Sequence, residues 1–160
     1  MIQIPNDLFF GWVESEIAEG HSVRFRLKGV SMYPLIRGDK DEVVLSPCST
    51  KDLKAMDVVL FRYRGKHLLH RIIRREGNAL TIKGDGSYVA EEECTVDDVV
   101  GKVRAIIRPS GKMISVNSWK WKAPSYIWRK MGFFRKPILR MLHFADKHFN
   151  TIAATSNHHP

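Results

Sequence analysis

The chain has 160 residues, which suffices for one domain and leaves little for a second. Hydrophobic residues make up 44% and charged residues 27% of the sequence, which excludes a disordered chain except near its ends. The formal net charge of +9 favours a partner that carries negative charge, but charge alone does not separate phosphates, anionic lipid headgroups and acidic proteins.

No segment is expected to cross a membrane or to direct export. The first twenty residues hold four acidic residues and no Lys or Arg, so they lack the basic start of a signal peptide. Nowhere do eighteen apolar residues follow one another. Cys48 and Cys94 form no metal or redox motif, and we interpret them as free thiols. We therefore expect a cytoplasmic protein that needs neither a metal nor another cofactor.

Residues 1–20 predict a short amphipathic helix. Leu8, Trp12 and Ile17 follow a roughly helical spacing, and Gly20 is a candidate stop. Asn6 or Asp7 is a candidate N-cap.

From residue 21 the hydrophobic period changes to two, as is typical of half-buried strands. Val23, Phe25 and Leu27 alternate with basic residues, and Gly65 marks a hairpin turn. Further strands are expected in DEVVLS (41–46), DVVLFRYR (57–64), HLLHRIIRR (67–75), ALTIKG (79–84) and VVGKVRAIIRP (99–109). Short strands without intervening helices favour a mostly β domain over residues 1–118, built as an antiparallel folded sheet or barrel.

Residues 119–160 read as a basic, aromatic extension that is partly helical and frays at its end, with one helix from about Pro137 to Phe149. The interleaved aromatic and basic residues leave two interpretations open. Residues 119–149 lie on an anionic membrane surface, which makes the protein peripheral to that membrane, or the aromatic side chains pack on the β domain. Nucleic acid is a less favoured partner because no recognisable motif accompanies the pattern.

Three short stretches hold the residues best suited to chemistry. They are Gly-Val-Ser-Met-Tyr-Pro at 29–34 followed by Gly38-Asp39, Asp-Val-Val-Leu-Phe at 57–61 followed by His70-Arg71, and Lys-Gly-Asp-Gly at 83–86. Ser31 lies in a turn, where its hydroxyl and its own N–H can face a cleft. A serine nucleophile needs a base, and His70 lies on an apolar strand face that disfavours the charged ring. Asp85 can orient that ring.

Taken singly, each of these residues has an ordinary structural explanation. A serine in a turn and a histidine on an apolar strand face usually serve the fold, and an aspartate between glycines usually bonds the backbone of its own turn. The order of the three stretches carries more information than any one of them.

In this order the stretches resemble the clan that holds the type I signal peptidases and the self-cleaving SOS repressors. The resemblance covers about residues 20–108 and implies the mostly β fold of that clan. It matches Ser31 to the nucleophile, and His70 to the base that is lysine in bacterial enzymes and histidine in the endoplasmic-reticulum and archaeal type. Asp85 matches the acid of the Gly-Asp box. The residues Gly29, Met32 and Pro34 of the serine box fall in the substrate-binding or oxyanion region.

The sequence also departs from the pattern of that clan. Gly29 lacks the hydroxyl that supports the oxyanion in many bacterial members, so the N–H of Ser31 must contribute more. A second acid is open among Glu91, Glu92 and Glu93, and we expect no counterpart of the usual transmembrane anchor.

The expected function is a serine endopeptidase that cleaves a peptide or protein substrate, such as a leader or signal-like peptide. One alternative is a binding module that keeps the fold without turnover. A self-cleaving regulator is disfavoured because about twenty residues precede the β region, too few for a helix-turn-helix domain. The sequence leaves the oligomeric state open.

Overall fold

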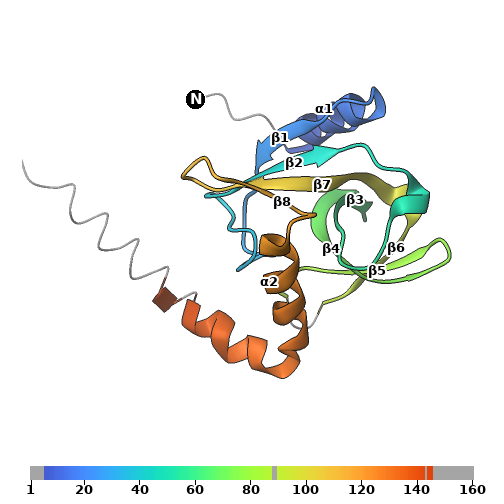
Figure 1. Cartoon of the computed structure of the whole chain (residues 1–160). Coiled ribbons are helices and arrows are strands. Elements are labelled where there is room, and N and C mark those ends of the chain that lie inside the picture. The colour runs from blue at the N-terminus through green and yellow to red at the C-terminus, as the bar shows by residue number, and fades with distance from the viewer. Residues whose placement is uncertain (1–5, 88–89, 143, 146–160) are drawn as a thin grey trace, which may run out of the picture.

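The computed structural model describes residues 6–87, 90–142 and 144–145. Figure 1 shows a curved β-sheet with one helix from each end of the chain packed on it. The elements are α1 (Asn6–Ala18), β1 (Val23–Arg26), β2 (Glu42–Ser46), η1 (Thr50–Asp52), β3 (Val58–Tyr63), β4 (Lys66–Glu76), β5 (Ala79–Lys83), β6 (Glu92–Thr95), η2 (Val96–Asp98), β7 (Val99–Ile107), β8 (Met113–Ser115), α2 (Trp119–Lys130) and η3 (Gly132–Phe134).

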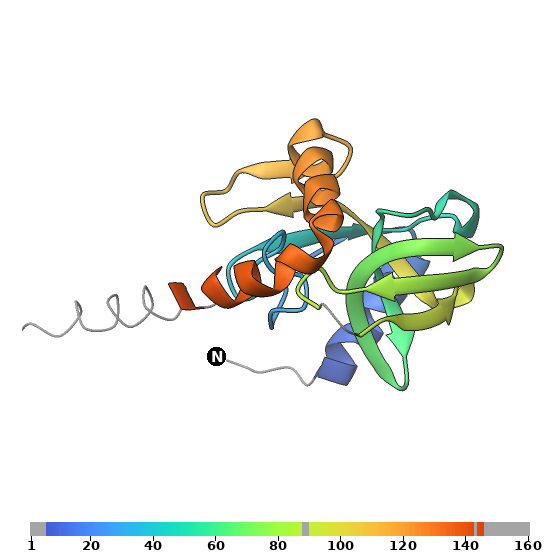
Figure 2. The same ribbon diagram turned by 90° about the horizontal axis from the view of Figure 1, so that it is seen from below.

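The strands form one antiparallel sheet in the order β1-β2-β7-β3-β4-β5-β6, and β8 also pairs with β7. The predicted mostly β, antiparallel class is therefore confirmed. The hairpin between β3 and β4 turns through Arg64 and Gly65, which have φ angles of 48° and 73°. Positive φ at both positions matches the right-handed twist of the flanking strands. Figures 1 and 2 show that the sheet is strongly curved.

The core is divided because β3 is buried on both of its faces. Leu60 points into a large cluster that α1, β1, β2 and β7 also line, and this cluster includes Val13 and Phe25. Val59 and Phe61 point the other way, into a second cluster with residues of β4 and β5. This second cluster lies beside the candidate base on β4.

The N-terminal helix is confirmed, but of the three expected apolar positions Leu8, Trp12 and Ile17 only Ile17 is buried. Val13 and Ile17 are buried, whereas Leu8 and Trp12 are exposed. The helix ends where expected, because Gly20 has a φ of 90° and the N–H groups of Gly20 and His21 bond back to Ile17 and Glu16.

The extension folds back on the β domain through α2, whose buried Trp121 joins the large core cluster. The chain is helical again from residue 135 to 142, two residues before the expected start at Pro137. Residues 146–160, which include the expected frayed end, lie outside the described part of the chain. Among the described residues, none of the helices is long and apolar enough to traverse a bilayer.

Both cysteines are free thiols that pack against the second cluster. Burial is the main reason that the pKa of Cys94 is raised, to about 11, and nearby carboxylates add to it. Few molecules therefore carry the thiolate at neutral pH, so Cys94 is poorly suited to act as a nucleophile.

Candidate active site

Ser31 lies in the long connection between β1 and β2 and is exposed. It lines a cavity of about 420 Å³ together with apolar side chains from α1, β1, β3 and β4. A hydrogen bond from the Tyr33 N–H to the Val30 carbonyl closes the turn around it. Among the described residues nothing accepts a hydrogen bond from the N–H of Ser31, so this donor can face a substrate.

Two glycines let the Ser31 loop cross its own backbone. A Cβ on Gly38 would lie 1.8 Å from the carbonyl oxygen of Gly29, a distance that no side chain can occupy. Gly29 itself has a φ of 82°, which favours glycine. The Gly-Asp pair that follows the serine box therefore has a structural reason, which is closure of the loop that carries Ser31.

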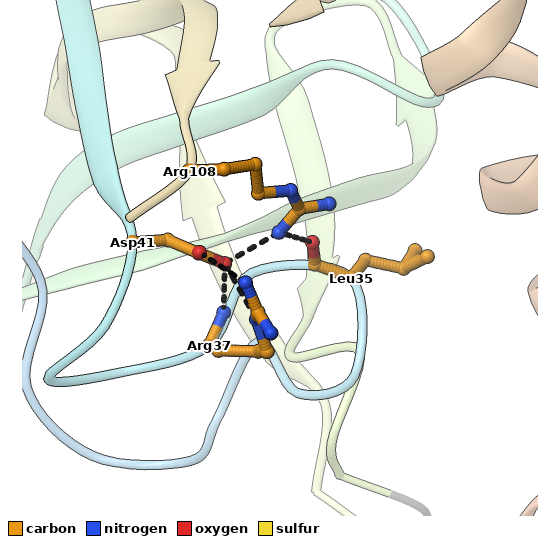
Figure 3. A network of polar contacts seen from close by, with 4 residues as sticks. All are labelled: Leu35, Arg37, Asp41 and Arg108. Atoms are coloured by element: carbon orange, nitrogen blue, oxygen red, sulfur yellow. Dashed lines mark hydrogen bonds and ion pairs between the residues drawn. The ribbon is translucent and has the colours of Figure 1, made fainter. Parts of the chain in front are cut away.

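A buried ion-pair network ties the same loop to the end of β7, as Figure 3 shows. The carboxylate of Asp41 is wholly buried and accepts hydrogen bonds from the Arg37 backbone N–H at 2.8 Å, from the Arg37 guanidinium at 3.0 Å and from Arg108. Arg108 also donates to the Leu35 carbonyl at 3.1 Å. Burial by itself would raise the pKa of Asp41, but the Arg37 hydrogen bonds and the charges of Arg108 and Arg37 lower it overall. The sequence analysis did not predict this network of Asp41, Arg37 and Arg108.

The Gly84-Asp85-Gly86 turn packs directly on the backbone of the Ser31 turn. The Gly86 N–H donates to the Ser31 carbonyl at 2.8 Å. A Cβ on Gly84 would lie 2.4 Å from the Ser31 carbonyl oxygen, and one on Gly86 would lie 2.3 Å from that of Val30. The third sequence stretch therefore supports the first through main-chain contacts that require glycine.

His70 lies on β4 and is 6% exposed. Its Nδ1 lies 3.1 Å from a carboxylate oxygen of Glu92 on β6. Because an ionised carboxylate only accepts hydrogen bonds, Nδ1 carries the proton of the neutral ring and Nε2 keeps a lone pair. Nε2 faces Gly84, where an added Cβ would lie 3.2 Å from it. Nε2 of His70 and the carbonyl oxygen of Ser31 thus both border the position that a side chain on Gly84 would occupy.

The expected contact between Asp85 and His70 is wrong. Asp85 accepts two hydrogen bonds from Arg71, at 2.8 Å from Nε and 2.7 Å from Nη2, and both residues are buried. The reason is the pleat of β4, which points the adjacent residues His70 and Arg71 to opposite faces of the strand. Asp85 lies on the Arg71 side, and Glu92, one of the three glutamates left open above, takes the position next to His70.

The remaining residues of the serine box are divided between two cavities. Gly29 and Met32 line the same cavity as Ser31. Pro34 instead lines a separate cavity with Arg37 and Arg108, so the structure does not bring it to the expected substrate region.

A second histidine–glutamate pair lies close by and was not predicted. His67 lines the Ser31 cavity, and its Nε2 lies 2.6 Å from a carboxylate oxygen of Glu14 on α1. The ring of Phe10 stacks on it with the centroids 5.0 Å apart. His67 and His70 are three residues apart on β4, so their side chains leave opposite faces of the strand.

The C-terminal extension contributes to the support of this site. Trp128 of α2 donates from Nε1 to the Asp85 carbonyl at 2.9 Å. The guanidinium of Arg71 lies 5.3 Å from the ring centroid of Trp121. Arg135 donates to the Ser87 carbonyl at 2.9 Å. In the sequence, the signal for this packing was the presence of large aromatic side chains such as Trp121 and Trp128 in the extension.

Comparison with models of protein families and with curated proteins finds no match for this chain. The resemblance to signal peptidases therefore rests on the residues quoted above. Among the described residues, no three His, Cys, Asp or Glu side chains gather in a way that could hold a metal ion.

Proposed function

We propose that the chain is a serine endopeptidase with Ser31 as nucleophile and His70 as general base. One observation carries this proposal: His70 is held at Nδ1 by Glu92, while its Nε2 faces the glycine on which the Ser31 turn packs. A histidine oriented by a carboxylate, with its second nitrogen directed toward a serine turn, has the parts of a catalytic triad.

In this mechanism the Ser31 hydroxyl attacks the substrate carbonyl as Nε2 of His70 takes its proton. The Ser31 N–H donates to the oxyanion that forms. His70 then gives the proton to the leaving amine, and an acyl-enzyme remains. Water, deprotonated by the same nitrogen, releases the acid product and restores Ser31. Glu92 holds the ring and stabilises its charged form in both steps.

The surroundings of Ser31 suit an extended peptide with an apolar side chain near the cleaved bond. Phe25, Leu27 and Met32 line the cavity beside the serine. Among the described strands β1 pairs with β2 alone, which leaves its other edge open to a substrate strand.

The direct test is cleavage of a diverse peptide mixture, with products identified by mass spectrometry. We expect Ser31→Ala and His70→Asn each to lower the rate by roughly 10³-fold or more while thermal unfolding is unchanged. His21→Asn is the matched control, because it removes a histidine that also pairs with a glutamate but does not line the Ser31 cavity. Equal cleavage by wild type and Ser31→Ala would refute the proposal.

A binding module without turnover is the second candidate, favoured by one observation. No hydrogen bond joins Ser31 Oγ to His70 among the described residues. Such bonds often tighten only when substrate is bound. A peptidase should release product in wild type and none in Ser31→Ala, whereas a binding module should retain the same peptides in both proteins and release no product from either.

A further inference from the structure

The helix α2 has apolar side chains on two opposite sides. Trp121 and Trp128 face the β domain and are buried. Trp119, Tyr126 and Ile127 are exposed; they are seven and eight residues apart and therefore share the other side of the helix. Core packing explains the inner side of α2 but leaves the outer side unexplained.

The same arrangement continues beyond α2. Leu139 is buried in a cluster with Tyr33 and Trp128, while Phe134, Met141 and Phe144 are exposed. We call these three residues, together with Trp119, Tyr126 and Ile127, the outer face; each of the six is between 57% and 74% exposed. Figures 1 and 2 show α2 and the helix after it as two consecutive helices that meet at an angle beside the β domain. Scattered exposure does not account for so many large apolar side chains on one segment.

The charge around the outer face has one sign. Residues 99–145 contain eleven Lys and Arg and no Asp or Glu. Lys120, Lys130 and Arg140 are exposed beside the apolar side chains, and the ammonium of Lys130 lies 5.5 Å from the ring centroid of Tyr126. Apolar side chains flanked by cations are the pattern of a helix that lies in the interface of an anionic bilayer.

We propose that the outer face docks on an anionic phospholipid bilayer, with its apolar side chains in the interface and the exposed cations Lys120, Lys130 and Arg140 beside the lipid phosphates. The exposed aliphatic side chains of Ile127 and Met141 favour a bilayer over a nucleic acid as the partner. Aliphatic side chains insert among acyl chains but provide no flat surface for stacking bases. In this arrangement the outer face lies at the surface of the bilayer.

Docking in this way would serve the candidate active site. Tyr33, two residues after Ser31, packs against Trp128 and Leu139 of the docking helices. The bilayer would therefore lie close to the Ser31 turn and bring it near peptides held at the membrane. This consequence rests on the proposed peptidase function, whereas the docking itself does not.

The test is sedimentation of the full chain with vesicles of phosphatidylcholine alone or with 30% phosphatidylglycerol. We expect binding to the anionic vesicles, weakening with added salt, and little binding to the neutral ones. The triple variant Trp119→Ser, Ile127→Ser, Phe134→Ser should bind the anionic vesicles more weakly than wild type by about tenfold. The matched control, Leu8→Ser, Trp12→Ser, Met113→Ser, removes equally exposed apolar side chains elsewhere and should bind as wild type does.

Further arms separate the sources of the phosphate and the kinds of partner. Lys120→Gln with Arg140→Gln removes two exposed cations beside the outer face and should weaken binding to the anionic vesicles. Inorganic phosphate at millimolar concentration should not displace the vesicles.

Equal binding of the two triple variants, or no preference for anionic vesicles, overturns the proposal. Tighter binding of single-stranded oligonucleotides, lost in the outer-face variant, would overturn it in favour of nucleic acid. Ser31→Ala must bind as wild type does, so a peptidase failure remains distinguishable.

Discussion

At the scale of single residues, the two carboxylates nearest the candidate site have different tasks. Glu92 contacts His70 and belongs to the proposed chemistry. Asp85 neutralises Arg71, which also donates to the Met56 carbonyl at 2.9 Å. Removal of the first should change the rate, and removal of the second should change the stability.

Glu92→Gln should lower kcat/KM by on the order of 10²–10⁴-fold with little change in the free energy of unfolding. The amide no longer fixes the Nδ1–H tautomer and does not stabilise the charged ring. Cleavage kinetics and urea unfolding of the same preparation measure the two effects. Unaltered kinetics in this variant would show that Glu92 has no part in the reaction.

Asp85→Asn should instead destabilise the protein by about 3–5 kcal/mol, because Arg71 is left as a buried charge without a carboxylate. Asp97→Asn is the control, since Asp97 is exposed and its change should cost well under ~1 kcal/mol.

At the scale of elements, the candidate site is built by loops that rigid strands hold in place. The Ser31 loop and the turn at residues 84–86 touch main chain to main chain. A single Cβ added to the turn would therefore push the two segments apart. Glycine is required here by close approach, and not by the backbone angles alone.

Gly84→Ala should therefore weaken both activity and stability. Its Cβ would lie 2.4 Å from the Ser31 carbonyl oxygen and 3.2 Å from Nε2 of His70, so the turn must move away from the base. We expect a loss of about 1–3 kcal/mol in stability, by the cost of overpacking, and at least a tenfold loss in rate.

Gly11→Ala provides the matched control for this prediction. Gly11 lies within α1 with open space around it, so the same change should stabilise the protein by about 0.5–1 kcal/mol and leave cleavage unaltered. A Gly84→Ala protein that cleaves at the wild-type rate would show that the contact does not position Ser31.

At the scale of the whole molecule, alternation in the sequence was enough to predict β1, which lies at one end of the strand order. Val23 and Phe25 are buried between exposed arginines, as the period of two indicates. The strand β6 was missed because its residues, Glu92 to Thr95, are polar or half-buried at an edge of the sheet. The helix α2 was missed because Pro124 and the many basic residues obscure its helical period.

The candidate site was predictable only as far as local sequence determines it. Ser31 and His70 lie in recognisable stretches of sequence. The partner of Asp85, however, depends on whether Asp85 lies on the Arg71 face or on the His70 face of β4. Glu92 could not be told from its two neighbours, because only pairing of β6 with β5 brings it to His70. Asp41 and Arg108 are 67 residues apart and carry no shared local pattern.

The same Asp41 network links the Ser31 loop to the end of β7, and it predicts how the stability of the fold responds to acid. The folded-state pKa of Asp41 is lowered, so its stabilising effect is fully present above the pKa of an unfolded aspartate, about 3.9, and is lost as pH falls through the folded value. Urea unfolding of wild type should therefore show stability falling steadily below about pH 4.

Asp41→Asn isolates that contribution from those of other carboxylates. At pH 7 the variant should be less stable than wild type by about 3 kcal/mol, because Arg37 and Arg108 lose the buried charge that they share. The difference should shrink as the pH falls, since acid removes from wild type what the substitution has already removed. A difference between the two proteins that stays constant from pH 7 to pH 2 would mean that Asp41 stabilises the fold by its shape and hydrogen bonds, and not by its charge.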